Sequence, residues 1–189
     1  MAENAFLIRK TTTADVAKLP AVERSAAKAF RSIPELAWIA DDDPQTAARH
    51  LELMESGVSW VAVPDSGGGE SLLADGHGPI GFLNGRLLNG FLHIWEMSVD
   101  ERCQGRGIGK RLLQTAVDHA RQRNYKGLTL TTFLDVPWND GFYKARGFVL
   151  LAPQHVSPPL NLSRYAEGDI QPLITVSFVG DKHTNAGFT

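Results

Sequence analysis

Apolar positions along the chain follow two spacings, one typical of helices and one typical of strands. Between residues 108 and 121 apolar side chains recur at helical intervals and polar or charged ones fill the rest, which predicts an amphipathic helix. Further helical patterns begin near Pro20 and cover residues 45–56 and 139–146. Runs rich in β-branched, aromatic and aliphatic residues predict strands at 5–10, 58–63, 80–88, 91–99, 127–133, 148–152 and 173–179. Such interleaving of helices and strands is typical of a mixed α/β domain.

Turn-forming residues mark the connections between these elements. Asn89-Gly90, between two predicted strands, is the strongest hairpin signal, because both residues tolerate the positive φ of a tight turn. Segments 64–79 and 153–172 are predicted to be surface connections, and 180–189 a frayed tail. No internal repeat divides the sequence, so residues 1–189 are expected to form a single domain.

Charge and cysteine content narrow the function. The 189 residues carry a formal net charge of −2, and no basic block indicates nucleic-acid binding. No apolar run approaches the roughly 20 residues of a membrane span, and the N-terminal segment lacks the apolar core of a signal peptide. With Cys103 as its one cysteine, the chain is expected to be a cytoplasmic protein without an internal disulfide. Cys103 has no neighbouring base in sequence, so it is interpreted as a loop residue and not as a nucleophile.

Acidic residues gather in one place, at 41–43, just before a predicted helix. Two interpretations stay open: negative charge that caps the N-terminus of that helix, or an acidic patch that attracts a cationic substrate. Trp38 lies close to this run in sequence and is a candidate for the wall of an acceptor pocket. The other three tryptophans are expected in the core.

The most informative segment is CQGRGIGK, residues 103–110, between a predicted strand and the long predicted helix. Its alternating glycines let backbone N–H groups approach an anion closely, and the helix adds the positive end of its dipole. The spacing does not fit a dinucleotide fingerprint, because Lys110 stands where the third glycine is required. It does not fit a Walker loop either, because only three residues separate Gly105 from Gly109.

The pattern Gln-x-x-Gly-x-Gly at residues 104–109 resembles the acetyl-CoA-binding motif of the GNAT superfamily of N-acetyltransferases. The segment from Asn139 through Tyr143 to Gly147-Phe148 is similar to a second motif of that family, and the matching parts cover about residues 80–150. One departure is Glu101, where the family usually has a proline. The resemblance implies a mostly antiparallel central sheet of six or seven strands with helices on both faces, and acetyl-CoA as co-substrate without a metal.

The resemblance also implies which residues hold the cofactor. Arg106 and Lys110 are expected to add positive charge near the diphosphate, and a backbone N–H around Met97 to Val99 to donate to the oxyanion. Asn139 is similar to the family's asparagine that touches the pantetheine arm, although a helix N-cap residue would look the same from sequence. The expected cofactor-binding residues are Met97, Val99, Gln104, Gly105, Arg106, Gly107, Ile108, Gly109, Lys110 and Asn139.

Acetyl transfer to an amine needs a group that takes a proton from the amine and one that protonates the leaving thiolate. By resemblance, Tyr143 is the expected general acid. Glu96 is the preferred base, because a carboxylate can bind an ammonium group and take its proton; His93 is the alternative, with an ordinary pKa suited to the task. On a regular strand these two residues face opposite sides, so only one can face the site unless a bulge intervenes, as the family has in this strand. The same parity argues against a His93–Glu96 metal pair, and no metal is expected.

The sequence thus predicts an N-acetyltransferase in which a primary amine attacks the thioester directly, since no Gly-x-Ser-x-Gly elbow or Cys–His pair supplies a protein nucleophile. A small-molecule amine is favoured as acceptor, because the protein is only mildly acidic. Two alternatives stay open: acetylation of a protein lysine or N-terminus, and a catalytically silent acyl-CoA-binding module. No nucleic-acid or membrane partner is expected, and a homodimer is left open.

Overall fold

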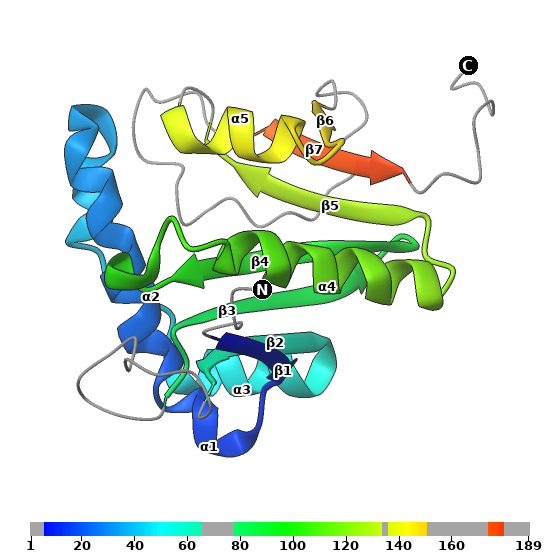
Figure 1. Cartoon of the computed structure of the whole chain (residues 1–189), viewed down its shortest axis with the longest axis horizontal. Coiled ribbons are helices and arrows are strands. Elements are labelled where there is room, and N and C mark those ends of the chain that lie inside the picture. The colour runs from blue at the N-terminus through cyan, green and yellow to red at the C-terminus, as the bar shows by residue number, and fades with distance from the viewer. Residues whose placement is uncertain (1–5, 66–77, 134–135, 151–173, 180–189) are drawn as a thin grey trace.

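The computed structural model of the chain describes residues 6–65, 78–133, 136–150 and 174–179 (Figure 1). These residues form one seven-stranded sheet in the order β1-β2-β3-β4-β5-β7-β6. Only the β4–β5 pair is parallel, which confirms the predicted mixed, mostly antiparallel sheet. Its strands are β1 (Phe6–Lys10), β2 (Val58–Pro64), β3 (Gly81–Leu88), β4 (Phe91–Val99), β5 (Gly127–Thr132), β6 (Val149–Leu150) and β7 (Ile174–Val179).

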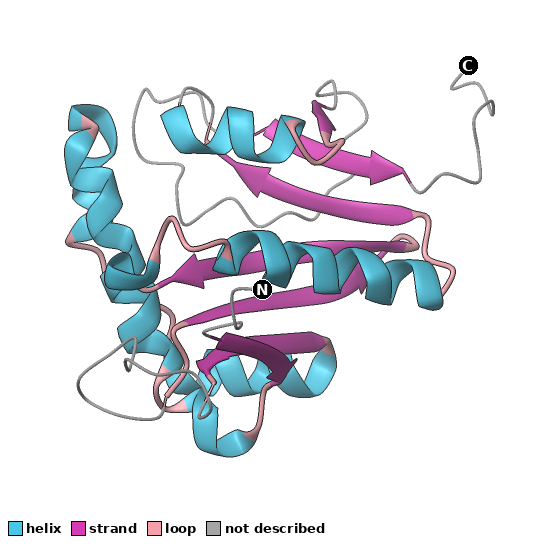
Figure 2. Ribbon diagram, viewed as in Figure 1, coloured by secondary structure: helices cyan, strands magenta, loops and turns pink. Residues whose placement is uncertain are grey.

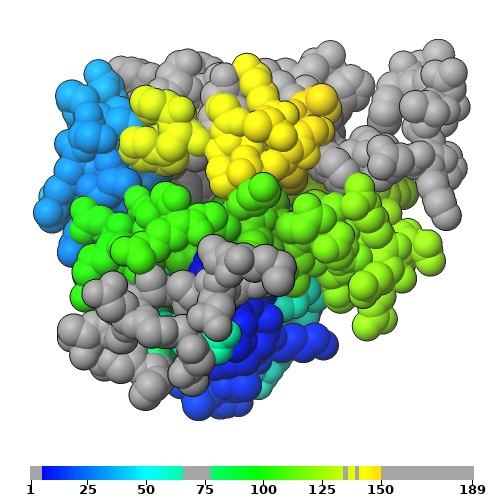
Figure 3. All heavy atoms as spheres, in the orientation of Figure 1, coloured from blue at the N-terminus to red at the C-terminus, as the bar shows by residue number. Residues whose placement is uncertain are grey.

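Helices cover both faces of this sheet, as the resemblance implied (Figure 2). Figure 3 shows α4 running across one face, with α5 beside it. The α-helices are α1 (Thr13–Val16), α2 (Leu19–Ala27), α3 (Ala47–Ser56), α4 (Ile108–Gln122) and α5 (Pro137–Lys144), and the 3-10 helices are η1 (Lys28–Ser32), η2 (Pro34–Ala40) and η3 (Glu101–Cys103). The predicted connection at 153–172, the tail at 180–189 and most of the loop at 64–79 lie outside the described residues.

The apolar stripe of α4 forms the larger core, as its sequence pattern predicts. Leu112 and Leu113 are fully buried against the sheet, with Leu83 of β3 among their neighbours. Each leucine buried in this way contributes about 1.5–3 kcal/mol. Side chains alternate along a strand, so Phe82, which directly precedes Leu83 in β3, points to the opposite face of the sheet. There it packs against Leu19 of α2. The alternation within β2 and β3 therefore explains why one sheet holds helices on both sides.

Two predicted helix starts need correction. The helix expected at 45–56 begins at Ala47, and the Thr46 side chain caps it by accepting a hydrogen bond from the backbone N–H of Arg49 at 3.2 Å. The acidic run does not cap that helix: Asp41 ends η2 and pairs with Arg31 at 3.1 Å. A capping charge acts within the first turn of a helix, and this run lies too far upstream.

The helix expected at 139–146 begins instead at Pro137, because proline is suited to the first turn, where its missing N–H has no partner to lose. The predicted hairpin is confirmed: Asn89 and Gly90 both have positive φ, at 52° and 86°, and join β3 to β4.

Gly57, at the C-terminal end of α3, lies against the sheet so closely that no side chain fits. A Cβ at this position would stand 2.2 Å from the carbonyl oxygen of Gly85 in β3. We therefore expect Gly57→Ala to lower the free energy of unfolding by about 1–3 kcal/mol, because the backbone must shift to remove the clash. Urea denaturation followed by circular dichroism measures the change.

Gly141 provides the matched control, because it lies within α5 and a Cβ there meets nothing within 4 Å. Gly141→Ala should raise the free energy of unfolding by about 0.5–1 kcal/mol, as expected for glycine in a helix. Equal stability of the Gly57 variant and the wild type would contradict the packing described for α3.

Candidate active site

A cavity of about 1360 Å³ lies where β4 and β5 separate. The parallel pairing of these strands joins Phe91–Ile94 to Gly127–Leu130 and stops there, although β4 continues beside β3 to Val99. Residues 94–99 and 130–133 line the two sides of the opening. Backbone groups along this edge of β4 are therefore placed to bind a ligand, because β5 does not pair with them there.

An extra residue in β4 marks the point of separation. In the ladder with β3, Gly85 pairs with Ile94 and Asn84 pairs with Glu96, so Trp95 has no partner and forms a bulge. The bulge reverses the alternation of the strand, because one residue is inserted into a repeat of two.

The bulge places both candidate bases on one face. His93 pairs with Arg86 and Glu96 pairs with Asn84, and residues 84 and 86 lie on the same face of β3 because they are two apart. His93 and Glu96 consequently share that face, and both line the cavity. The expectation that only one of them faces the site assumed the alternation of side chains in a regular strand, and the bulge removes that assumption.

His93 is buried, with only 4% of its surface exposed, and its Nδ1 lies 2.9 Å from the hydroxyl oxygen of Thr129. Burial lowers the pKa of His93 to about 4, because the charged imidazolium loses hydration. The expectation that His93 has a pKa suited to neutral catalysis is therefore wrong. At neutral pH this imidazole is uncharged.

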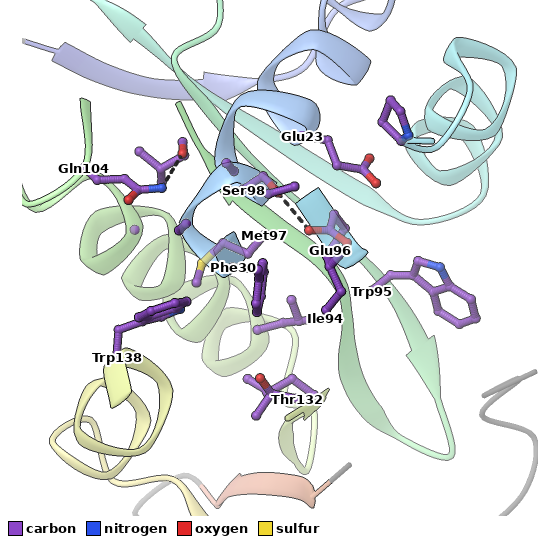
Figure 4. A pocket seen from close by; sticks show the side chains of 18 of the residues that line it. Glu23, Phe30, Ile94, Trp95, Glu96, Met97, Ser98, Gln104, Thr132 and Trp138 are labelled. Carbon is purple, nitrogen blue, oxygen red and sulfur yellow. Dashed lines mark hydrogen bonds between the residues drawn. The ribbon is translucent and has the colours of Figure 1, made fainter. Parts of the chain in front are cut away.

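Glu96 and Tyr143 approach the cavity from different elements. Glu96 Oε1 accepts a hydrogen bond from the Ser98 hydroxyl at 2.8 Å, which fixes the carboxylate beside the opening (Figure 4). Tyr143 reaches the cavity from α5, where its ring packs edge-to-face on Phe142 and Phe148. Burial, and then the nearby Glu96 charge, raise the pKa of Tyr143, so its hydroxyl stays protonated and is able to donate.

The glycine turn forms one end of the cavity, which most of its residues line. Gly105 and Gly107 have φ of 74° and 82°, in the left-handed region that favours glycine. Gly107 is the N-cap of α4 and supplies no side chain to cap it, so the first N–H groups of a 15-residue helix lack intrahelical acceptors. Lys110 lines the cavity, whereas Arg106 is exposed and does not line it. The Gln104 side chain donates to the Val99 carbonyl at 3.1 Å and so ties the turn to the free edge of β4.

Asn139, Trp38 and Cys103 complete the residues singled out in the sequence. Asn139 is the third residue of α5, so it is not the N-cap of that helix, and its side chain lies outside the described residues. Trp38 is 42% exposed and is not among the described residues that line the cavity. Cys103 lines the cavity from the end of η3 and is not in a loop. It is buried, and burial raises the pKa of its thiol, as expected for a residue that is no nucleophile.

Sequence reasoning missed several wall residues because they are apolar or come from distant elements. Trp95 and Trp138 were expected in the core, yet both line the cavity. Phe30 of η1 contacts the Trp138 ring at 5.6 Å and the Phe133 ring at 6.1 Å, measured between ring centroids. Trp138 directly precedes the motif that begins at Asn139, and this position was the one signal in the sequence that could have placed it at the cavity wall.

Comparison with known proteins identifies this arrangement. Residues 24–148 match the family model described as the acetyltransferase (GNAT) family. The chain belongs to this family. It is an acetyl-CoA-dependent N-acetyltransferase, as the glycine turn predicted.

Solved structures similar to this GNAT chain confirm the fold. The PaiA N-acetyltransferase from Thermoplasma acidophilum in complex with coenzyme A is 15% identical, with 93% of this chain and 100% of that chain covered and a TM-score of 0.65. YncA, a putative acetyltransferase from Salmonella typhimurium with acetyl-CoA, is 19% identical, with 96% and 98% covered and a TM-score of 0.64. The ribosomal-protein-S18-alanine N-acetyltransferase from Escherichia coli is 14% identical, with 95% and 99% covered and a TM-score of 0.63.

Two further observations concern the described part of this GNAT chain. None of its helices has an apolar stretch long enough to cross a bilayer. In the same residues, no three His, Cys, Asp or Glu side chains gather as metal ligands.

The low pKa of His93 makes a measurable prediction about stability. The unfolded chain binds a proton at His93 with an ordinary pKa of 6.5, whereas the folded chain does so only near 4. Between these values the unfolded state binds more protons, so the free energy of unfolding falls as the pH is lowered from 6.5 toward 4. The His93 contribution to this loss is at most about 3 kcal/mol.

Urea unfolding at several pH values, together with NMR titration of the His93 ring, measures both quantities. The His93→Gln variant keeps a polar side chain beside Thr129 and should lose less stability than the wild type over this pH window. An imidazole that titrates near 6.5 in the folded protein would show that the described burial of His93 is wrong.

Proposed function

We propose that the protein transfers the acetyl group of acetyl-CoA to the primary amine of a small molecule, by direct attack of the amine in the cleft between β4 and β5. The observation that carries the proposal is the meeting of three features there. The open end of α4, the free edge of β4 and the pair Glu96 and Tyr143 all line the same cavity.

The glycine turn suits the diphosphate of coenzyme A. A Cβ at Gly105 or Gly107 would meet no atom within 4 Å, so the space beside the turn is open to a ligand. The uncapped N–H groups of α4 and the Lys110 ammonium supply hydrogen bonds and positive charge for phosphate oxygens. When bound, acetyl-CoA supplies an acetyl group activated as a thioester, from which the CoA thiolate departs as the leaving group.

Glu96 is placed to accept a proton from the amine. Its carboxylate lies at the side of the cleft that the bulge exposes, and the Ser98 hydroxyl holds one of its oxygens. A carboxylate has about four acceptor sites, so the hydrogen bond from Ser98 does not exhaust its capacity to accept from an ammonium group or a bridging water. His93 is almost fully buried and its Nδ1 faces the Thr129 hydroxyl, whereas Glu96 is only partly buried beside the cleft, so Glu96 is the better candidate.

Tyr143 is placed to return a proton to the sulfur. Its raised pKa keeps the hydroxyl protonated, which is the form that a general acid requires. Successive N–H groups of a strand point to opposite edges, so the segment from Met97 to Val99 directs only alternate N–H groups to the edge that β5 leaves open. A group on that edge is able to donate to the carbonyl oxygen as negative charge develops. The oxyanion donor that the resemblance implied is assigned to this edge.

The walls of the cleft favour a small acceptor. Phe30, Phe133 and Trp138 come from three elements, and their rings meet at centroid distances of 5.6 and 6.1 Å. This aromatic contact joins η1 to α5, so one side of the cleft is closed by side chains and leaves less room for a folded protein. Acetylation of a protein N-terminus is the second candidate, because the similar enzyme from Escherichia coli bears the name of a ribosomal-protein acetyltransferase.

Thiol release from acetyl-CoA in the presence of a panel of small primary amines tests this function. We expect at least one such amine to accelerate release beyond any rate seen with unstructured peptides that offer a lysine or a free N-terminus. The Tyr143→Phe variant should lower kcat by roughly 100-fold, because the leaving thiolate then lacks its proton donor. Calorimetry with acetyl-CoA shows whether that loss lies in chemistry or in cofactor binding.

Tyr125→Phe is the matched control, because Tyr125 packs against His119, away from the residues that line the cleft. It removes the same hydroxyl group and should keep the wild-type kcat. Unchanged turnover in Tyr143→Phe would exclude this tyrosine as the acid, and faster acetylation of peptides than of any small amine would favour the second candidate.

A further inference from the structure

A chain of buried polar side chains crosses the sheet on the face that carries α2 and α3. The Thr11 hydroxyl lies 2.6 Å from that of Ser59, and Ser59 donates to the Asn84 side-chain oxygen at 2.6 Å. The Asn84 amide nitrogen lies 3.1 Å from Nδ1 of His50. Asn84 and His50 are fully buried, so water cannot replace these contacts. The chain ends at Glu23, whose Oε2 lies 3.3 Å from Nε2 of His50.

The hydrogen bonds in this series of side chains all run in one direction, toward Glu23. An amide nitrogen only donates, so Asn84 donates to Nδ1 of His50, and that nitrogen carries no proton. The proton of the neutral imidazole is then on Nε2, where it faces Glu23. His50 thereby turns its N–H toward the carboxylate, and Asn84 fixes the orientation of the ring from the other side.

Glu23 is held from two directions. Its Oε1 accepts from the backbone N–H of Gln45 at 3.1 Å, and its Oε2 is buried next to His50. Neither Oε2 nor His50 Nε2 has a well-aligned hydrogen bond within the described residues, although the two atoms lie 3.3 Å apart. The Glu23 side chain keeps 15% exposure and lines the cleft, as Figure 4 shows.

An apolar set of side chains would fill the same space without the cost of burying polar groups. The neighbours are apolar already: the His50 ring packs edge-to-face on Phe82 at 5.0 Å, and Phe82 belongs to the cluster with Leu19 and Val22. What the polar chain adds is a fixed carboxylate at the wall of the cleft. Glu23 is therefore a feature of the site and not only of the core.

Charge on this wall is predominantly negative. The residues of α2, β4, α3 and the segment before α3 that line the cleft include two cations, Arg24 and Arg49. Arg49 pairs with Glu52, outside the cleft, at 2.5 Å, and Arg24 lies 3.7 Å from Asp43. The carboxylates from the same elements are Glu23, Asp42, Asp43 and Glu96.

We propose that Glu23 binds a second cationic group of the acceptor, and that His50 is the residue that positions it. The reacting nitrogen must lose its proton before attack, and Glu96 is assigned to that proton. Glu23, held by the Gln45 N–H and by the close approach of His50 Nε2, acts instead as a static counter-charge for an ammonium group that does not react. The acceptor class is thus an amine with two cationic groups, an inference that rests on the proposed function.

Matched pairs of amines test the inference. Putrescine and pentylamine have the same length, as do cadaverine and hexylamine, and each pair differs by one ammonium group in place of a methyl group. We expect kcat/KM to be higher for each diamine than for its monoamine, mainly through KM. Glu23→Gln should lower the diamine-to-monoamine ratio of kcat/KM by about tenfold or more, because a charge-assisted hydrogen bond is lost.

Glu55→Gln is the control for charge, because Glu55 is exposed on α3 and does not line the cleft; it should keep the wild-type ratio. His50→Gln retains an acceptor for Asn84 and a donor for Glu23 and should preserve most of the ratio, whereas His50→Leu should lower it. Thermal unfolding and acetyl-CoA binding, measured for each variant, confirm that the protein compared is folded.

A diamine-to-monoamine ratio of kcat/KM near one in the wild type, or a diamine preference that survives Glu23→Gln, would overturn the role of Glu23. The proposed function would still stand in that case if the monoamines are acetylated. Equal loss of the ratio in His50→Gln and His50→Leu would show that His50 does not position Glu23 through these hydrogen bonds. If no amine of either kind accelerates thiol release, the proposed function and this inference fail together.

Discussion

The parting of β4 from β5 is the constraint on which the rest of the site depends. Parallel pairing ends at Ile94, and the next residue, Trp95, is the extra residue of the bulge. A bulge bends its strand and strengthens the local twist, so the two strands diverge where the ladder is interrupted. The result is a cleft with a free strand edge on one side and a helix N-terminus at its end.

Two kinds of group line this cleft. Backbone N–H groups, which need no particular side chain, belong to the glycine turn and to the edge of β4. The side chains proposed to move protons are Glu96 on β4 and Tyr143 on α5. Phe142, next to Tyr143, lies close to Gly109, since a Cβ there would stand 3.7 Å from the phenyl ring, so α5 is packed directly against the start of α4. The position of the acid is thereby coupled to the position of the cofactor turn.

Local sequence signals were sufficient for most of the elements and for the glycine turn. The stripe of α4, the Asn89-Gly90 turn and the glycine spacing all depend on residues close together in the chain, where periodicity and φ preferences apply. The bulge could be expected only from the family resemblance, because an inserted residue leaves no mark on the apolar pattern of β4.

Long-range contacts account for what sequence reasoning could not reach. Glu23 meets the backbone of a residue 22 positions away, and Asn84 meets His50 across 34 positions. No local pattern links such residues. The same limit explains the tryptophans, since Trp95 and Trp138 look apolar in sequence and become cleft walls only because the strands separate. Helix capping was one of the two interpretations of the acidic run, because Pro44 suggested a helix start, but the cap is Thr46.

The central claim is that the bulge turns Glu96 into the cleft as the base. The pH dependence of kcat/KM in the wild type, Glu96→Gln and His93→Asn tests it most directly. The account predicts that Glu96→Gln abolishes the acidic limb of the profile and lowers the rate by roughly 100-fold or more, while His93→Asn retains the limb. A profile that keeps its acidic limb in Glu96→Gln and loses it in His93→Asn would contradict the account.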